Sequence, residues 1–255
     1  ENALTLITGD VGGSFGMKGA IYPEVPLMGW ASKRIGRPVK WRCERTEGFA
    51  ADDHGRDNVT DAELALDADG KFLAIRVKTN ANLGAYVSFL GFGPSTGNIG
   101  GMVGPYTIPA AHVTVTGVIT NRSPISPYRG AGRPEASYVI ERLVQLAEQE
   151  TGIDAIELRR RNFIPPAAMP YKTALTFTYD CGEFEKNMDL TLEMADYAGF
   201  ELRRAESAKA GKLRGIGVSN TIERAAAPGI EAAEIRVARG GSVTIMSGSC
   251  TQGQG

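Results

Sequence analysis

Cysteine and histidine are scarce in this sequence. Among 255 residues there are three cysteines and two histidines, namely Cys43, Cys181, Cys250, His54 and His112. They lie far apart, and no CxxC or histidine-rich spacing of zinc or iron–sulfur sites accompanies them. We therefore expect free thiols in a reducing compartment and no metal ligands. Neither histidine is placed beside a nucleophile, so hydrolysis through a catalytic triad is not supported.

Long apolar runs and an excess of charge are missing as well. No segment reaches the roughly 18 consecutive apolar residues of a transmembrane helix, and the first residues do not form a secretion signal. Lysine and arginine number 28 against 29 acidic residues, which gives a formal net charge of -1. This balance provides no basic field for a nucleic acid or an anionic membrane. The sequence predicts a soluble, cytoplasmic protein.

Glycine, by contrast, is abundant. The 32 glycines include clusters in residues 12–19, 91–104, 130–132 and 248–255. Such clusters allow positive φ angles and a close approach of the backbone to a ligand. Ordinary turns use glycine in the same way, so a single cluster does not decide between the two interpretations.

Apolar periodicity predicts helices and strands in mixed order. Helices are expected over residues 23–35 and 134–152, from 154 onward, over 184–198, and in a polar stretch reaching 212. Strands are expected at residues 3–8, 59–66, 72–77, 113–119, 213–221, 232–238 and 242–246. The sequence therefore predicts an α+β fold of mixed sheets and β-hairpins with packed helices.

Two stretches lack a clear period. Residues 80–109 are rich in glycine, asparagine and proline, and we expect them to be irregular and mostly at the surface. Residues 162–186 are expected to form a long crossover. Asp154 and Glu157 form a capping signal for the helix that follows. The arginines at the end of that helix, Arg159 to Arg161, are interpreted as a solvated last turn that opposes the helix dipole.

The first glycine loop, GDVGGSFGMKG, matches neither common phosphate loop. A Walker A loop requires Gly-Lys followed by Ser or Thr, but Met17 separates Gly16 from Lys18. A Rossmann loop requires another glycine spacing and an acidic residue about 20 positions later, whereas Glu24 comes too early. What remains is a tight loop whose amides can face an anionic or oxo group. Phe15, between glycines, either belongs to that site or fills a core.

The second motif, SPYRGAGRPEA, places Arg129 and Arg133 among small residues at the start of a helix. Backbone amides and the helix dipole favour an anion at such a position, and a guanidinium adds bidentate hydrogen bonding. In the alternative, Arg129 pairs with Glu135 and Gly130 only turns the chain.

The third motif, GSCTQGQG, ends the sequence. Gln252 and Gln254 can each donate and accept hydrogen bonds, which suits the edge of a heterocycle. The same residues can also form a disordered tail.

Taken in order, GGSFGMK, WRCERTE, PYRGAGRPEA and GSCTQGQG resemble the molybdenum-binding large subunit of the xanthine dehydrogenase, aldehyde oxidase and carbon monoxide dehydrogenase family. The resemblance covers the whole chain and implies the molybdopterin-binding fold of that subunit. It implies that three loops hold the cofactor, formed by Gly13, Phe15 and Gly16, by Arg129, Gly130, Ala131 and Gly132, and by Gln252, Gly253, Gln254 and Gly255.

The resemblance also implies an activity and partners. The cofactor is molybdenum with molybdopterin or its cytosine dinucleotide form. The family hydroxylates small molecules with oxygen from water, and electrons pass to [2Fe-2S] clusters on a small subunit and to FAD on a medium subunit. The full complex is expected to be a dimer of heterotrimers. The general-base glutamate of the family is expected outside this chain, so no catalytic residue is assigned here.

Departures from the family pattern narrow the substrate. Gly130 stands where carbon monoxide dehydrogenases carry the cysteine that binds copper, which argues against oxidation of carbon monoxide. Gly19 and Ala131 replace a glutamate and a phenylalanine of xanthine dehydrogenases, which argues against purines. The pattern is most similar to aldehyde and N-heterocycle hydroxylases.

The resemblance makes this chain a central fragment of a longer subunit. Residues 1–212 are expected to form a molybdopterin-binding and substrate region, and residues 213–255 the truncated start of a second molybdopterin-binding domain. The fragment alone is expected to be inactive and to need the rest of the large subunit. The competing hypothesis is a non-catalytic fragment or excised domain that binds partner subunits without activity.

Overall fold

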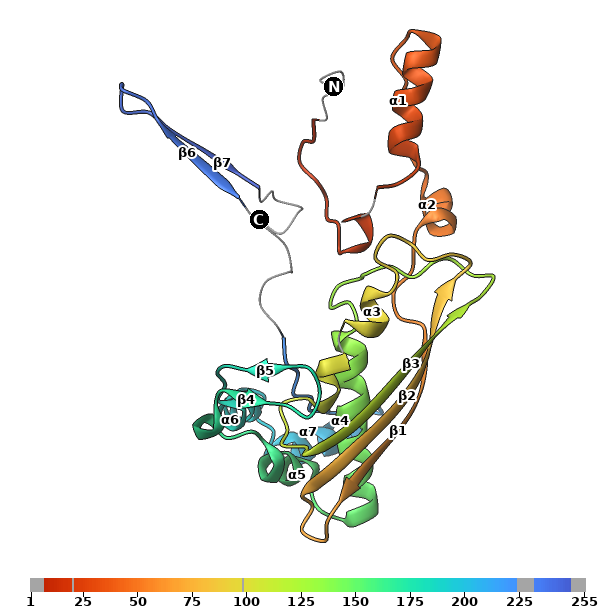
Figure 1. The fold of residues 1–255 in the computed structure, drawn as a ribbon. Helices are drawn as coiled ribbons and strands as arrows, with labels where there is room; N and C mark the ends of the chain where they lie inside the picture. The colour runs from red at the N-terminus through yellow and green to blue at the C-terminus, as the bar shows by residue number, and fades with distance from the viewer. Residues whose placement is uncertain (1–6, 20, 98, 224–231, 249–255) are drawn as a thin grey trace. The chain divides into compact units, whose positions relative to one another are not determined.

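The protein was analysed as a computed structural model, which describes residues 7–19, 21–97, 99–223 and 232–248. The chain divides into two compact units. The larger unit is Cys43–Glu223, and the smaller one combines Glu1–Arg42 with Arg224–Gly255. Both units contain helices and strands in mixed order, so the α+β class is confirmed (Figure 1). The predicted division after residue 212 stays a prediction.

A three-stranded sheet forms one side of the larger unit (Figure 1). Strand β1 (Asn58–Leu66) pairs antiparallel with β2 (Phe72–Gly84), which pairs parallel with β3 (Ala110–Ile119). In the turn between β1 and β2, the Asp67 carboxylate accepts two backbone N–H bonds, and Gly70 has a φ of 77°. The predicted hairpin is confirmed, because these turn residues and the alternating pattern agree.

Two capped helices pack beside the sheet. Helix α4 (Arg133–Thr151) has Pro134 in its first turn and ends at Gly152, whose φ of 73° suits a glycine C-cap. Helix α5 (Ala155–Asn162) begins after Asp154, whose side chain accepts hydrogen bonds from two backbone amides. Both predicted helix starts are confirmed.

The remaining elements of the larger unit are short or peripheral. They are α2 (Arg45–Ala51), α3 (Gly93–Thr96), the 3-10 turns η2 (Ile99–Val103) and η3 (Pro166–Ala168), strands β4 (Tyr171–Lys172) and β5 (Thr178–Tyr179), and helices α6 (Phe184–Met194) and α7 (Phe200–Lys209). The predicted helices near residues 184–212 are confirmed as two separate helices. The long crossover expected at 162–186 contains η3, β4 and β5.

Apolar residues of β2, α4 and α5 form the core of the larger unit. The largest fully buried ones include Ile75 and Val77 of β2, Ile140 of α4 and Leu158 of α5. The Tyr106 ring adds an aromatic centre to this core. It stands edge-on to Phe72 at 5.4 Å and stacks on Phe163 at 5.5 Å between ring centroids.

The expectation that residues 80–109 are irregular and mostly at the surface holds for much of residues 85–97 and is wrong for the two ends of the segment. Strand β2 continues to Gly84, and Met102, Val103 and Ile108 are buried in the core. This segment joins two parallel strands, so it has to cross the unit, and it packs against α4. Its glycines serve close packing. A Cβ added at Gly100 would lie 2.4 Å from the Thr176 hydroxyl oxygen.

The predicted strand at residues 213–221 is also wrong. Residues 213–223, called the strap below, contain no strand. Side chains hold this segment in place of a backbone ladder. Arg159 donates to the carbonyl oxygen of Val218 at 3.0 Å, and Arg133 pairs with Glu223 at 2.6 Å between Nε and Oε1. The strap is therefore fixed by arginines of two helices.

Arg159 is buried, contrary to the solvated last turn expected for it. Its side chain is 1% exposed and donates from Nε and Nη2 to one carboxylate oxygen of Glu141, at 3.1 and 2.9 Å. The Tyr106 hydroxyl donates to the other oxygen of Glu141. Burial, followed by the charge of Glu141, raises the pKa of Tyr106. Because these groups satisfy one another, a charged residue is accommodated in the core.

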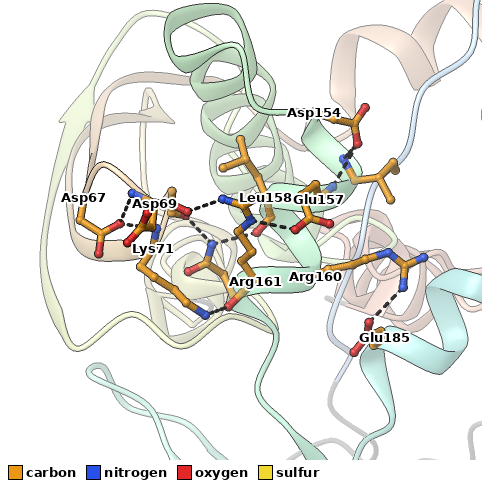
Figure 2. A network of polar contacts seen from close by, with 12 residues as sticks. Asp67, Asp69, Lys71, Asp154, Glu157, Leu158, Arg160, Arg161 and Glu185 are labelled. Carbon is orange, nitrogen blue, oxygen red and sulfur yellow. Dashed lines mark hydrogen bonds and ion pairs between the residues drawn. The ribbon is translucent and has the colours of Figure 1, made fainter.

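Arg160 and Arg161 also pair with other elements (Figure 2). Arg160 contacts Glu185 of α6 at 3.0 Å, and it also pairs with Asp189. Arg161 donates to Glu157 at 2.8 Å and to the carbonyl oxygen of Asp69 in the β1–β2 turn at 2.6 Å. The end of α5 therefore faces the hairpin turn and α6, which explains why the expectation of a solvated turn fails.

The described part of the smaller unit contains an α-helix and a β-hairpin. Helix α1 (Glu24–Ile35) follows the 3-10 turn η1 (Met17–Gly19), and β6 (Ala233–Val237) pairs antiparallel with β7 (Val243–Ser247). The predicted helix and hairpin are confirmed. Of the strand expected at residues 3–8, the first four residues lie outside the described ranges, and the last two are not in a strand.

Candidate functional site

The first glycine loop belongs to the smaller unit and contains an unusual aromatic residue. Phe15 has a φ of 54°, a left-handed conformation that bulky residues rarely adopt. Its side chain lies against Gly13, where an added Cβ would be 2.4 Å from the ring, and Gly16 follows at a φ of 95°. Phe15 is 52% exposed, so it does not fill a core. Such strain is typical of ligand-binding loops.

The second loop, Arg129 to Gly132, belongs to the larger unit and leads into α4. Gly130, Ala131 and Gly132 have φ angles of 97°, 45° and 97°. A Cβ added at Gly130 would lie 2.5 Å from Cγ of Pro134. Glycine is therefore required at position 130 by both conformation and space.

Two arginines hold successive carbonyl groups of this second loop. Arg56 donates from Nη2 to the carbonyl oxygen of Arg129, and Arg133 donates from Nη1 to that of Gly130 at 3.3 Å. Within the described residues, the amides of Gly130 and Gly132 donate no hydrogen bond. With the carbonyl groups bound to cations, these two N–H groups remain for a ligand.

The amide of Ala131 is not available in the same way. It donates to the carbonyl oxygen of Tyr128 at 2.9 Å, and the amide of Arg133 donates to that of Gly130 at 3.0 Å. Of the amides in this loop, that of Ala131 is therefore not available to an anion, because it closes the turn.

Arg129 carries the positive charge of the site. Its side chain is exposed, and within the described part of the chain its guanidinium makes no hydrogen bond or ion pair. The alternative pairing with Glu135 is wrong. Glu135 lies 3.7 Å from Nε of Arg56, whose guanidinium also stacks over the Tyr128 ring at 5.2 Å. An unpaired guanidinium beside two free amides fits a phosphate or a similar anion.

Sequence reasoning missed Arg56 and Glu223 as neighbours of the second loop. Arg56 precedes Arg129 by 73 positions, and no local spacing links the two residues. The one local signal is Gly55, where an added Cβ would lie 2.8 Å from Cβ of Tyr128. That signal indicates a close approach of two segments without saying which segments meet.

The third predicted segment, Gln252, Gly253, Gln254 and Gly255, lies outside the described residues. The first loop belongs to one unit and the second loop to the other. The convergence of the three loops on one ligand therefore stays a prediction.

Membrane-spanning helices, metal-ligand clusters and cysteines can be checked only within the described residues. None of the helices there is long and apolar enough to span a membrane. No group of three or more His, Cys, Asp or Glu side chains in that part of the chain is arranged to hold a metal ion. Cys43 and Cys181 are exposed thiols that form no disulfide, and Cys250 lies outside the described residues.

Two domain models match this sequence. Residues 1–163 match a molybdopterin cofactor-binding domain, and residues 190–255 match a second molybdopterin cofactor-binding domain. The first match includes both described loops, and the second includes the whole strap and the third motif. Together they cover most of the chain.

Similar proteins carry names of larger oxidoreductases. Over 96% of this chain, the sequence is 34% identical to the 6-hydroxypseudooxynicotine dehydrogenase complex subunit gamma of Paenarthrobacter nicotinovorans, of which it covers 32%. Over its full length it is 36% identical to the carbon monoxide dehydrogenase large chain of Hydrogenophaga pseudoflava, of which it covers 34%.

A solved structure gives the same result for the fold. Quinoline 2-oxidoreductase from Pseudomonas putida 86 superimposes with a TM-score of 0.84 and 30% sequence identity, over 96% of this chain and 33% of that one. The chain thus spans about a third of the length of each of these proteins.

Proposed function

Because this chain belongs to the molybdopterin cofactor-binding family of molybdenum-dependent oxidoreductase large subunits, we propose that it forms part of the cofactor cradle of a molybdenum hydroxylase. The observation that carries the proposal is the exposed guanidinium of Arg129, which has no partner among the described residues, next to the amides of Gly130 and Gly132, which donate no hydrogen bond there. These groups fit the phosphate-bearing part of a molybdopterin.

Each loop has a separate task in this proposal. Arg129 binds an anionic group of the cofactor, and the amides of Gly130 and Gly132 orient it. The first loop places Phe15, exposed and at positive φ, near the metal and excludes water there. Gln252 and Gln254 hydrogen-bond the edge of the pterin. When bound, the cofactor supplies a two-electron oxidation of substrate carbon with oxygen derived from water.

The proposed substrate is an aldehyde or an N-heterocycle. The likeness to quinoline 2-oxidoreductase supports the heterocycle, since quinoline is one. The chain is also similar to a carbon monoxide dehydrogenase large chain, but carbon monoxide is not the proposed substrate. Gly130 provides no thiolate at the position where the copper-binding cysteine is expected. Ala131 likewise leaves out the phenylalanine expected for purine oxidation.

The proposed partners follow from the same comparison. A relative named as the gamma subunit of a dehydrogenase complex supports a multi-subunit assembly. We propose that the remaining parts of the large subunit complete the site and supply the general-base glutamate. A small subunit with [2Fe-2S] clusters and a medium subunit with FAD accept the electrons, in a cytoplasmic dimer of heterotrimers.

Replacement of Arg129 tests the proposal. We expect Arg129→Ala in the full complex to lower molybdenum and pterin content at least about tenfold, because a charge-assisted contact to the cofactor is lost. Metal analysis and the fluorescence of the oxidised pterin measure the two contents. The control is Arg204→Ala, which removes an exposed ion pair with Glu201 on α7. Full cofactor content in Arg129→Ala would contradict the assignment.

The substrate class is tested on the same preparation. We expect reduction of an artificial electron acceptor with quinoline-type heterocycles or with aldehydes, and none with carbon monoxide or xanthine. Turnover of carbon monoxide by the complex would show that the substitution at Gly130 does not exclude that substrate.

A further inference from the structure

We propose that Arg133 is a positioning residue, which couples the second loop to the strap and thereby keeps the loop in its cofactor-binding conformation. This inference rests on the proposed function, because it concerns retention of the same cofactor. Arg133 does not touch the proposed ligand in this account. It acts through the backbone of Gly130.

The Arg133 guanidinium bridges two segments of the larger unit. Nη1 donates to the carbonyl oxygen of Gly130 at 3.3 Å, and Nε lies 2.6 Å from Oε1 of Glu223. The Arg133 side chain is 25% exposed, whereas that of Glu223 is 65% exposed. A planar guanidinium can hold both partners at once because its donors point in fixed, different directions. The carboxylate thus fixes the arginine that fixes the loop.

The second loop needs such support because its backbone is strained. Three consecutive residues have positive φ, and the central one, Ala131, lacks the freedom of glycine. Conformations of this kind persist only where the surroundings determine them. Arg56 holds the preceding carbonyl group, that of Arg129. The Arg133 backbone amide also donates to the Gly130 carbonyl oxygen, at 3.0 Å, so the guanidinium supplies a second hydrogen bond to the same oxygen. Loss of this second bond weakens the hold on the peptide between Gly130 and Ala131, which lies between the amides of Gly130 and Gly132.

The strap needs a tether for a different reason. Within the described residues it forms no strand ladder, so its position depends on side-chain contacts. Besides the pair of Glu223, these include the Val218 carbonyl bound by Arg159 at 3.0 Å, Asn220 near the Met188 sulfur at 3.7 Å, and Arg214, which donates to the Ser207 hydroxyl at 2.9 Å. Glu223 is the last residue of the larger unit. Its partner Arg133 therefore acts where the chain leaves this unit.

The pair also connects the two domain matches. Arg133 lies in the stretch that matches the first molybdopterin cofactor-binding domain, and Glu223 lies in the stretch that matches the second. The pair therefore links the two matched regions beside the second loop, as a coupling role requires. An exposed ion pair between neighbours in the chain would not link them, and it would add little to stability.

The experiment measures how long the full complex keeps its cofactor. Wild type, Arg133→Ala, Arg133→Lys and Glu223→Gln are purified, dialysed, and sampled for molybdenum by metal analysis and for pterin by fluorescence. The matched control is Arg203→Ala. Arg203 pairs with the Asp196 carboxylate, donates to the Ala195 and Asp196 carbonyls, and is 31% exposed. Thermal unfolding of each cofactor-free complex separates a general loss of stability from a loss of positioning.

We expect Arg133→Ala to lose molybdenum and pterin together about tenfold faster than wild type, which corresponds to about 1.4 kcal/mol. Arg133→Lys keeps the charge and should restore part of the retention. Glu223→Gln should lie between wild type and Arg133→Ala. Combining Arg133→Ala with Glu223→Gln should add nothing, because both changes break one coupling. The cofactor-free melting temperatures of Arg133→Ala and Arg203→Ala should fall equally.

Three results would overturn the inference. They are retention by Arg133→Ala at the wild-type rate, equal loss in Arg203→Ala, and additive effects in the double variant. If wild type itself contains neither molybdenum nor pterin, the proposed function fails and this inference fails with it. If wild type is loaded and Arg133→Ala keeps its cofactor equally well, only the coupling role is wrong.

Discussion

At the scale of single residues, this chain uses arginine to fix the backbone as much as to offer charge. Arg56 and Arg133 each bind a carbonyl group of the second loop and a carboxylate. The guanidinium of Arg129, in contrast, has no partner within the described residues. Chemically identical side chains thus take different roles, because only the neighbours decide which donors remain for a ligand.

Tyr179 permits a residue-scale prediction about alkaline pH. It is 7% exposed and donates to the carbonyl oxygen of Gly104 at 3.0 Å. Burial, followed by the charge of Tyr171, raises the pKa of Tyr179 from 10.0 to about 12. The neutral form is therefore favoured by folding. Its contribution is complete below pH 10, and it is lost as pH rises from 10 to about 12, because the unfolded chain ionises first.

The replacement Tyr179→Phe makes this testable. The difference between 10.0 and about 12 corresponds to roughly 3 kcal/mol of unfolding free energy at the alkaline end. We expect the variant to be about 1 kcal/mol less stable than wild type at pH 8, where it lacks one hydrogen bond. This gap should close and reverse toward pH 12. Urea unfolding at each pH measures it, with exposed Tyr138→Phe as control. A gap independent of pH would contradict the prediction.

At the scale of elements, one asparagine joins the hairpin turn to α5. Asn162 is fully buried, and its side-chain oxygen accepts the amide of Phe72 at 2.8 Å. Its side-chain nitrogen donates to the carbonyl oxygens of Gly70 and Leu158, each at 2.8 Å. Lys71 and Arg161 reinforce the junction from outside (Figure 2). The turn between β1 and β2 is therefore part of the packing of α5.

We expect Asn162→Ala to lower the unfolding free energy by roughly 3 kcal/mol, because it leaves buried backbone groups of the turn and the helix without partners. Urea-induced unfolding followed by circular dichroism measures the loss. Asn187→Ala, an exposed asparagine on α6, is the matched control and should change stability by less than about 0.5 kcal/mol. Equal effects of the two replacements would show that the junction does not stabilise the unit.

At the scale of the whole molecule, the two units differ in how much they bury. The larger unit contains a continuous core built from β2, α4, α5 and the crossover. In the smaller unit, every residue of β6 and β7 is exposed. A single two-stranded hairpin is marginally stable in water. The chain spans about a third of each protein to which it was compared, and the proposed function assigns the remaining contacts to the rest of that subunit.

Hydrogen exchange of the 255-residue chain should reflect this difference. We expect the slowest amides in β2 and α4, which exchange only when the larger unit unfolds. Amides of β6 and β7 should exchange at least about 100-fold faster, although their pairing is as regular as that of β1 and β2. Mass spectrometry of peptides from each element measures the rates. Comparable protection of the β6–β7 hairpin would mean that it is stabilised by more than its own ladder.

Much of the fold and part of the site follow from local sequence. The start of α5 and the hairpin turn were predictable because Asp154 and Asp67 bond to amides two to four residues away. A turn at Gly130 followed from its glycine-rich motif. The partner of the Arg129 carbonyl and the Glu135 carboxylate could not be predicted, because it is Arg56, which comes from a distant segment.

The sequence by itself determined the starts of α4 and α5, the chemistry of the β1–β2 turn and the family, because these depend on neighbours within a few positions and on motif order. Tertiary structure alone decided which arginine of α5 is buried, which amides of the second loop are free, and that Arg133 reaches Glu223. Those outcomes depend on groups far apart in the chain. Their desolvation and pairing exist only once the elements have packed.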